Sequence, residues 1–328
     1  MNKNVIVIGG GIVGCLTALE FKKKGFEVTV VDKGLIGSEA SSAAAGILYP
    51  LLPWNYNDEI FNICKSSEKF YEDLSKKFFD DLNIDIEFIK SQLLVFQPND
   101  EKEIIKWADK NKIKIYKKNK SILIPNISHI NPKMLMLSLK LYLKKIGINI
   151  IENSEILEFE GKNNNLETIV TKDKKKLMAN YFILSAGAWT SLLNKNIAKE
   201  IRPIRGQIIQ YEPSNINFKN ILFSQGMYIF QRKDKSIIAG STLDDVGFSK
   251  KNLNENLNKL DLKAKSIAPE LSKLKIIKSW YGFRPGKDDN QPIISQDFKF
   301  KNIFIHSGHF RYGITMAPET SRRLMKLL

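Results

Sequence analysis

The chain has 328 residues, of which 43% are hydrophobic, and a formal net charge of +16. This composition excludes a disordered chain, and the length suffices for a buried core and a buried cofactor. No apolar run reaches the roughly 18 residues of a membrane-spanning helix, and the run at residues 4–8 is too short for a signal peptide. The two cysteines, Cys15 and Cys64, indicate buried thiols in a reducing compartment. We therefore expect a cytoplasmic protein without a membrane partner.

The positive charge has two explanations. The 51 lysines and arginines exceed the 35 acidic residues, and such a balance can serve nucleic-acid or membrane-surface binding. The lysines are dispersed along the chain, however, and runs such as 22–24 and 174–176 fall at polar segment ends, which is typical of solvated surface. We favour composition bias over a nucleic-acid partner.

The first 32 residues predict a strand, a glycine turn, a helix and a second strand. Residues 4–8 are continuously apolar, as in a buried parallel strand. Residues 12–24 carry apolar side chains at helical spacing, and Gly25 ends this helix. Residues 26–32 form the second strand. This order is typical of the start of a doubly wound sheet.

The remaining chain contains segments with the periodicity of helices and segments with the periodicity of strands. Helices are predicted at 58–79, near 100–110, at 131–147, at 254–267 and from about 315. Buried strands are predicted at 181–185 and 302–307, and short antiparallel strands at 207–211, 227–231 and 236–239. Dinucleotide-type elements thus lie at the start, in the middle and at the end of the chain. We expect an α/β fold in which a discontinuous Rossmann-like cofactor domain carries an inserted α+β substrate domain built on an antiparallel sheet. The cofactor domain would comprise 1–83, 128–200 and 280–328, and the substrate domain 84–127 and 201–279.

The glycine turn at residues 9–14 (GGGIVG) fits the G-x-G-x-x-G pattern between a strand and a helix. Gly9 would make the tight turn, Gly11 would let the backbone approach a pyrophosphate, and Gly14 would let helix and strand pack closely. The helix N-terminus presents free amides to phosphate. Asp32, at the end of the second strand, is placed to accept hydrogen bonds from a ribose. The sequence therefore predicts a dinucleotide site.

Further segments, in the same order along nearly the whole chain, carry a resemblance to a known family. Residues 9–14, Asp32, 41–46 (SSAAAG), 185–188 (SAGA) and 308–313 (GHFRYG) resemble the D-amino-acid oxidase superfamily. The first strand, the small-residue loop, residues 282–286 (GFRPG) and residues 308–314 are similar to glycine oxidases of thiamine biosynthesis.

The resemblance implies FAD as a non-covalent cofactor. The residues implied at the glycine turn and the ribose are Gly9, Gly11, Ile12, Val13, Gly14, Asp32 and Lys33. Those implied at the pyrophosphate, flavin and adenine are Ala40, Ser41, Ala45, Gly46, Ile47, Ile156 and Gly187. Those implied along the pyrimidine side of the flavin are His309, Phe310, Arg311, Tyr312, Gly313, Ile314 and Thr315. Ala43 stands where some relatives carry a histidine bonded to flavin, and no cysteine follows Cys64.

The resemblance also implies a substrate site. Arg284 would clamp a substrate carboxylate, for which its rigid fork of donors is suited. Tyr228 would donate to the same carboxylate, and Arg311 would lie between flavin and substrate. Gly226 and Met227 differ from the residues usual in the family before the pocket tyrosine, so the size of the substrate stays open.

The implied reaction is the oxidative deamination of glycine or another small amino acid or amine. A hydride passes from the substrate Cα to flavin N5, water hydrolyses the imine to an oxoacid and ammonia, and dioxygen is the expected acceptor, giving H2O2. In the family this reaction serves thiazole formation for thiamine. Two alternatives stay open, namely a dehydrogenase with another electron acceptor and a flavoprotein linked to tRNA modification. We expect no metal site, and leave a homo-oligomer open.

Overall fold

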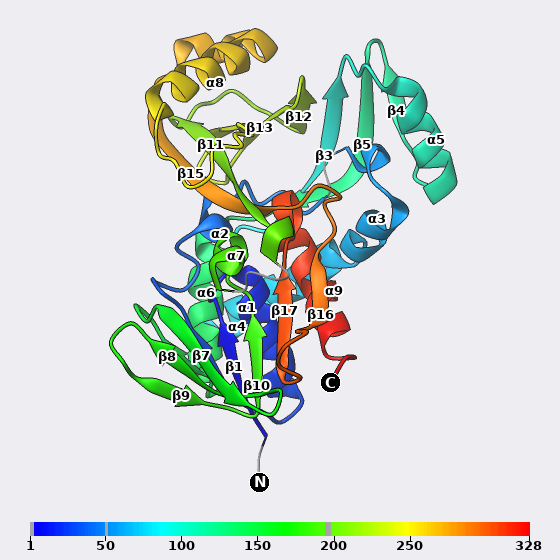
Figure 1. Cartoon of the computed structure of the whole chain (residues 1–328). Coiled ribbons are helices and arrows are strands. Elements are labelled where there is room, and N and C mark those ends of the chain that lie inside the picture. The colour runs from blue at the N-terminus through cyan, green and yellow to red at the C-terminus, as the bar shows by residue number, and fades with distance from the viewer. Residues whose placement is uncertain (1–2, 50–51, 194–197) are drawn as a thin grey trace.

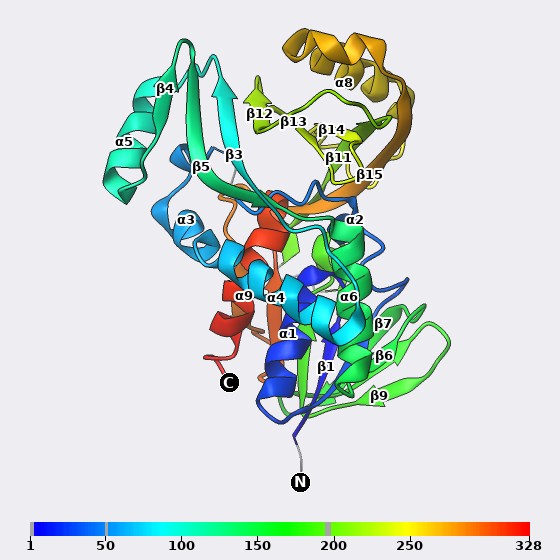
Figure 2. The same cartoon turned by 180° about the vertical axis from the view of Figure 1, so that it is seen from behind.

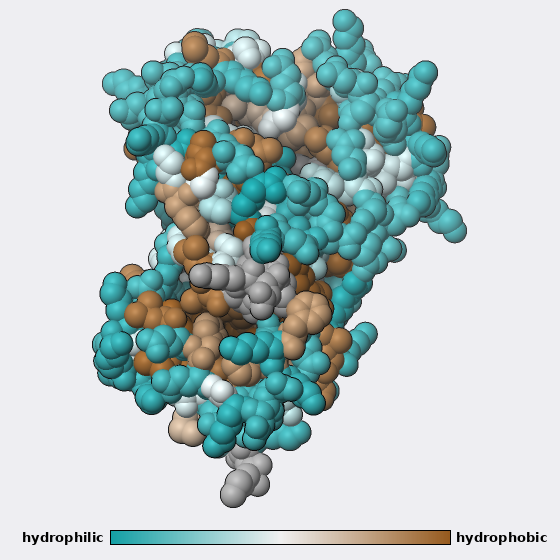
Figure 3. Space-filling model, in the orientation of Figure 1, coloured by the Kyte–Doolittle hydropathy of each residue, from teal (hydrophilic) through white to brown (hydrophobic). Residues whose placement is uncertain are grey.

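The computed structural model describes residues 3–49, 52–193 and 198–328. The chain forms three sheets, of six, eight and three strands. The six-stranded sheet lies in the lower half of Figure 1 and the eight-stranded sheet in the upper half. In the view of Figure 3 hydrophilic residues cover much of both halves, and apolar residues show at the waist between them and in patches on each half. The predicted combination of a Rossmann-like region with a mainly antiparallel region is confirmed.

The six-stranded sheet has the order β16-β17-β10-β1-β2-β6, and its strands are parallel except for the edge strand β16. The strands are β1 (Asn4–Ile8), β2 (Glu27–Val31), β6 (Asn149–Ile151), β10 (Tyr181–Leu184), β16 (Ile293–Gln296) and β17 (Ile303–Ser307). Val5 and Val7 point into a core with the helices, whereas Ile6 and Ile8 point into a core with the three-stranded sheet. Because both faces are covered, the strands are apolar throughout, which explains the unbroken run at residues 4–8.

Helices cover one face of this sheet and a small meander covers the other. Figure 2 shows the helices on the near side; they are α1 (Ile12–Lys23), α4 (Ser67–Leu82), α6 (Pro132–Lys145) and α9 (Gly313–Leu324). The meander, which the sequence did not predict, is β7 (Ile156–Lys162), β8 (Asn165–Thr171) and β9 (Lys176–Met178). Asn131 caps α6 by accepting hydrogen bonds from the amides of Lys133 and Met134, as its position before Pro132 predicts. None of the described helices is long and apolar enough to cross a membrane.

The helix predicted over residues 58–79 is two helices, α3 (Asp58–Cys64) and α4. Their buried side chains belong to different clusters. Ile60, Ile63 and Cys64 of α3 pack with Tyr312 and Met316, whereas the buried side chains of α4 pack with α1 and α6. One straight helix cannot present its apolar face to both places, so the chain turns between them.

The eight-stranded sheet has the order β15-β11-β14-β13-β12-β3-β5-β4. Its strands are β3 (Ile89–Phe96), β4 (Tyr116–Lys118), β5 (Ser121–His129), β11 (Arg202–Tyr211), β12 (Ile221–Ser224), β13 (Met227–Gln231), β14 (Ile237–Gly240) and β15 (Ile276–Gly286). All neighbours are antiparallel except β12 and β3, which join the two segments of chain that build the sheet. The helices α5 (Glu101–Asn111) and α8 (Leu253–Ile267) pack beside it, and α2 (Ala40–Ala43) and α7 (Thr190–Leu193) are single turns near the six-stranded sheet.

The predicted domain boundaries at 127/128 and 279/280 fall inside β5 and β15. Each of these strands is continuous, because its backbone hydrogen bonds to β3 or β11 continue past the boundary. β15 therefore carries residues 280–286 as part of the eight-stranded sheet. The division of the chain into two domains stays a prediction.

Candidate cofactor and substrate site

The glycine turn after β1 is too tightly packed for side chains. Gly9 has a φ of +108°, and a Cβ there would lie 2.4 Å from the carbonyl oxygen of Ser185. A Cβ on Gly14 would lie 1.9 Å from the carbonyl oxygen of Gly9. At this turn β1, α1 and β10 approach one another most closely, and only glycine leaves enough room for that approach.

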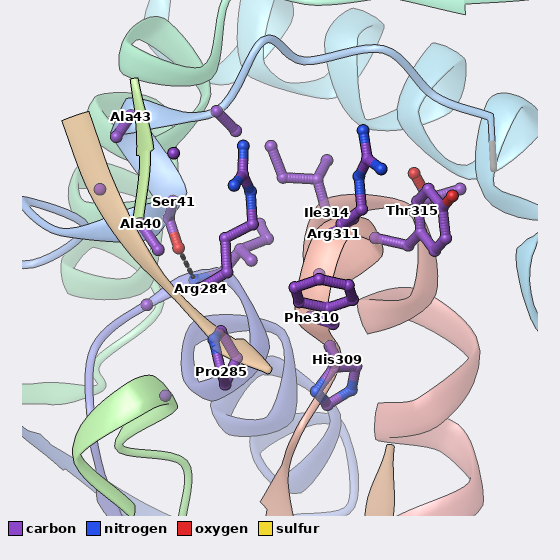
Figure 4. Close-up of a pocket in the computed structure, with 18 of the residues that line it drawn as sticks. Ala40, Ser41, Ala43, Arg284, Pro285, His309, Phe310, Arg311, Ile314 and Thr315 are labelled. Carbon is purple, nitrogen blue, oxygen red and sulfur yellow. Dashed lines mark hydrogen bonds between the residues drawn. The ribbon is translucent and has the colours of Figure 1, made fainter. Parts of the chain in front are cut away.

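Hydroxyl groups lie at the N-terminus of α1. The amide of Ile12 donates to the Ser41 Oγ at 2.9 Å, and Figure 4 shows this bond. The Ser41 hydroxyl proton stays available to a phosphate. Ser185 also lines this cavity, and its Oγ is buried without a hydrogen-bond partner among the described residues. The Ser41 hydroxyl beside a helix N-terminus fits a pyrophosphate.

At the end of β2, Asp32 is held by backbone amides. Its carboxylate accepts from Gly10 at 2.6 Å and from Gly34 at 2.8 Å, which fixes it toward the cavity. The neighbouring Lys33 places its Nζ 3.3 Å from the centroid of the Trp189 ring, and burial lowers the pKa of this lysine. This end of the cavity offers a carboxylate and an aromatic ring, which suits an adenosine.

The adenosine end and a second, deeper end form one elongated cavity, because Gly11, Ala40, Ser41, Ser185 and Gly187 line both. The predicted residues at the adenosine end are Gly9, Gly11, Asp32, Lys33, Ala40, Ser41, Ile156 and Gly187. Those at the deeper end are Gly11, Ile12, Val13, Ala40, Ser41, Ala45, Gly46, Ile47, Gly187, Tyr228, Arg284 and residues 309–315. Gly14 does not line the cavity and acts through packing. The structure thus brings the predicted set together in a slot whose shape and donors fit FAD.

Backbone segments form the walls of the deeper end. Gly46 has a φ of +87°, and a Cβ there would lie 2.2 Å from the Ile130 carbonyl oxygen. Arg232 is partly buried and links the two segments, because it donates to the carbonyls of Ile130 and, at 2.6 Å, Ala45. Opposite, α9 begins at Gly313, two residues before the predicted start, so the positive end of its dipole faces the cavity.

Arg284 projects from β15 into the deeper end. Its Nη2 donates to the Ser241 Oγ at 2.7 Å and its Nη1 to the Thr242 carbonyl at 3.2 Å. Its guanidinium lies against Gly206 on β11, where a Cβ would approach Nη1 to 2.1 Å. Burial lowers the pKa of Arg284 to about 10, and Tyr228 opposes the shift. The guanidinium therefore stays charged at neutral pH and bonds to neutral groups only.

Arg311 and Tyr228 complete the polar surface of this end. The side chains of Arg284 and Arg311 extend in the same direction into the cavity (Figure 4). Tyr228 is 4% exposed, and burial raises the pKa of its hydroxyl. No aspartate or glutamate is among the described residues that line the deeper end. Two guanidinium groups without a carboxylate are suited to an anion.

His306 and His309 also line the cavity, but both are tied into the protein. His306 Nδ1 lies 2.9 Å from the Thr17 Oγ1, and His309 Nε2 lies 3.0 Å from the Thr320 Oγ1. Burial lowers the pKa of both rings, that of His309 to about 3. The two rings are therefore neutral at pH 7. Across the described residues, no cluster of three or more histidines, cysteines or acids could hold a metal ion.

Sequence reasoning missed several groups at the site, namely Trp189, Gly206, Arg232 and Ser241, and it gave Ser185 no role although residues 185–188 carry part of the resemblance. Gly206 could have been found, because a glycine inside a strand often marks close approach of another group. The other three carry no local signal. Their roles come from contacts with segments that are distant in the sequence.

Comparison with known proteins agrees with this geometry. Residues 4–327 match the family DAO, described as FAD dependent oxidoreductase. A glycine oxidase of Pseudomonas putida is 29% identical over 348 residues, which cover 100% of this chain and 95% of the relative. The bifunctional protein ThiO/ThiG of Trichormus variabilis is 26% identical and covers 98% of this chain with 52% of its own length.

Solved structures show the same fold. The glycine oxidase of Geobacillus kaustophilus has a TM-score of 0.91 at 19% identity, with 99% of this chain and 95% of that chain covered. L-proline dehydrogenase from P. horikoshii has a TM-score of 0.85 at 22% identity, with 99% and 93% covered. With the family match over almost its whole length, the chain belongs to the family of FAD dependent oxidoreductases and is an enzyme that uses FAD.

Proposed function

We propose that this enzyme oxidatively deaminates glycine or another small amino acid. The observation that carries the proposal is Arg284, a partly buried guanidinium whose hydrogen bonds go to Ser241 and Thr242 and to no carboxylate. A buried charge without a counter-ion is unfavourable, so the site gains free energy when a ligand supplies one. A carboxylate matches the planar fork of donors.

The residues of the chain hold the substrate and position its Cα. Arg284 binds the carboxylate, the Tyr228 hydroxyl donates to it, and Arg311 adds positive charge on the other side. FAD, when bound, supplies the acceptor for a hydride from the substrate Cα. Orientation is the main contribution of the protein to such a step. The neutral, hydrogen-bonded His306 and His309 have structural roles in this proposal.

The balance of the reaction follows from these parts. For glycine, the amino acid, dioxygen and water give glyoxylate, ammonia and hydrogen peroxide. The relatives named glycine oxidase support glycine as the first substrate to test. The ThiO/ThiG relatives and the resemblance to glycine oxidases of thiamine biosynthesis support a role in thiazole formation. The cytoplasm as location belongs to the same proposal.

The test is anaerobic bleaching of the flavin by a panel of glycine, sarcosine, D-alanine, proline and methylamine. We expect bleaching by glycine or another amino acid in the panel, and none by methylamine, which lacks the carboxylate. Equal bleaching by methylamine would contradict the role of Arg284. Readmitting dioxygen and measuring one hydrogen peroxide per substrate tests the acceptor, and slow reoxidation would favour a dehydrogenase with another acceptor.

Non-covalent attachment of FAD is part of the proposal. Ala43 lines the cavity and has no group that can bond to flavin, and both cysteines are buried away from the deeper end. Acid precipitation should release intact FAD into the supernatant. Flavin fluorescence on the denatured chain after gel electrophoresis would contradict this.

A further inference from the structure

The segment between β14 and α8, residues 241–252, carries the two groups that bond to Arg284. These groups are the Ser241 hydroxyl, 2.7 Å from Nη2, and the Thr242 carbonyl, 3.2 Å from Nη1. Both residues follow the end of β14, so the path of this segment decides where the two groups lie. We call residues 241–252 the strap.

The strap begins with one residue more than the strand beside it. Ile208 of β11 pairs with Gly240, and Arg205 of β11 pairs with Asp244. Two residues of β11 therefore face three residues of the strap. Such an extra residue makes a β-bulge, which bends the chain and redirects the groups that it carries. This bulge contains both groups that bond to Arg284.

Asp244 closes the bulge with its backbone and with its side chain. Its backbone exchanges two hydrogen bonds of 2.9 Å with the backbone of Arg205. Its Oδ2 accepts from the Thr242 hydroxyl at 3.0 Å, from the Asn256 amide at 2.8 Å and from the Arg205 guanidinium at 3.1 Å. The Thr242 hydroxyl in turn accepts from the Gln207 amide of β11 at 2.9 Å. Thr242 is thereby held on two sides, which fixes the direction of its carbonyl.

The charge of Asp244 compensates a buried cation. Arg205 is 2% exposed, and its Nη1 donates to the carbonyls of Ser249 at 2.9 Å and Lys251 at 2.6 Å. Loss of the Asp244 charge would leave this guanidinium with neutral partners, which is unfavourable. Burial lowers the pKa of Arg284, and Asp244 is among the groups that oppose the shift, so its charge also acts on the substrate arginine.

We propose that Asp244 is a positioning residue for substrate binding, because it fixes the bulge from which Ser241 and Thr242 direct the donor fork of Arg284. The inference rests on the proposed function, since it acts through the binding of a carboxylate by Arg284. Donors that are ordered before the ligand arrives lose less entropy on binding. Loosening the bulge should therefore weaken the binding of carboxylates and leave FAD in place.

The test measures binding of radiolabelled acetate to the FAD-bound protein by equilibrium dialysis. Asp244→Asn should weaken acetate binding about tenfold, the cost of ordering one long side chain when the ligand binds. Asp245→Asn is the matched control, because Asp245 is the next acid of the strap but is exposed and pairs with Arg202 at 2.7 Å. The control should bind acetate as the wild type does. Equal weakening in both variants would overturn the role of Asp244.

Arg284→Ala separates this inference from the proposed function. We expect this variant to lose acetate binding. If it binds acetate as well as the wild type does, or if the wild type binds none, the carboxylate site fails and the role of Asp244 fails with it. If Arg284→Ala loses acetate while Asp244→Asn keeps the wild-type affinity, only the role of Asp244 is overturned.

A second variant keeps the ion pair between Asp244 and Arg205, whose loss could destabilise the fold. Thr242→Val removes only the hydroxyl through which Asp244 holds the bulge, so it should also weaken acetate binding. Combining it with Asp244→Asn should add little, because both changes break the same link. Additive losses of affinity would mean that the two residues act separately, which would contradict the proposal.

Kinetics distinguish positioning from general damage to the site. Anaerobic reduction of the flavin is measured over a range of concentrations of an amino acid that bleaches the wild type. In Asp244→Asn the half-saturating concentration should rise about tenfold, in step with the loss of acetate affinity, while the limiting rate changes less. A lower limiting rate at an unchanged half-saturating concentration would overturn the positioning role.

Discussion

The adenosine end of the cavity is built differently from the deeper end, which holds the proposed substrate site and is called the substrate end from here on. The adenosine end uses residues in short segments that follow strands of the parallel sheet, such as Gly9, Gly11 and Asp32. The substrate end uses single residues from β11, β13 and β15 and from the segment after β14, among them Gly206, Tyr228, Ser241 and Arg284. Changes at the first end should therefore affect cofactor retention, and changes at these four residues of the second end should affect the substrate alone.

The largest effect is expected at the substrate end. Arg284→Ala should keep FAD and lose about two to four decades of kcat/KM, because breaking a buried charge pair costs roughly 3–5 kcal/mol. Arg284→Lys should recover little, because a point charge cannot reproduce the fork. The measurement is flavin content together with the anaerobic reduction rate at several substrate concentrations. A wild-type rate at low substrate would show that Arg284 does not bind the carboxylate.

A smaller effect is expected from Gly206→Ala. The new Cβ would lie 2.1 Å from Arg284 Nη1 and would push the guanidinium away. Misplacing a binding group by about 1 Å can cost roughly 100-fold in rate, and here we expect it mainly in KM. Gly286→Ala is the matched control on the same pair of strands, since its Cβ meets the Ile204 side chain instead. Similar kinetics of the two variants would mean that the contact with Arg284 is unimportant.

The opposite pattern is expected at the cofactor turn. Gly14→Ala places a Cβ 1.9 Å from a backbone oxygen, so we expect a loss of about 1–3 kcal/mol in the free energy of unfolding and purification with little FAD. In Gly34→Ala the new Cβ would lie at an ordinary 3.4 Å from its nearest neighbour, the Ser38 Oγ, so this variant should keep both its stability and its FAD. Thermal unfolding with and without added FAD separates the two losses. Full flavin content in Gly14→Ala would contradict the expectation that changes at the cofactor turn reduce cofactor retention.

The smallest effect concerns pH and three buried histidines, of which His306 and His309 line the substrate end. Burial lowers the pKa of His129 and of His309 to about 3, and that of His306 well below its ordinary value. The unfolded chain binds a proton at each near pH 6.5, so stability falls as the pH drops below about 6.5, by up to about 1.4 kcal/mol per pH unit for each ring. Urea unfolding at pH 7 and at pH 5 gives the free energy of unfolding that is lost between the two. This loss should be about 2 kcal/mol smaller in His129→Asn than in the wild type. An unchanged loss would mean that this ring is protonated in the folded protein.

The sequence by itself determined the parallel sheet, the glycine turn and a dinucleotide site. These depend on local patterns, namely an apolar run, a glycine spacing and an acid at a strand end, and a parallel strand covered on both faces must be apolar throughout. FAD as the cofactor came from the resemblance. The resemblance supplied Arg284, Tyr228 and Arg311 as candidates. Their roles, and the division into domains, stay predictions.

Tertiary structure alone decided how the substrate end is assembled. β15 pairs with β11 over its whole length, which brings Arg284 onto Gly206 and beside Ser241, at separations of 78 and 43 residues. The sequence also did not predict the break between α3 and α4 or the meander β7–β9. In each of these cases the deciding interaction joins residues far apart in the chain. Local periodicity contains no record of such pairings, because it reports only which side of a segment is buried and not which segment covers it.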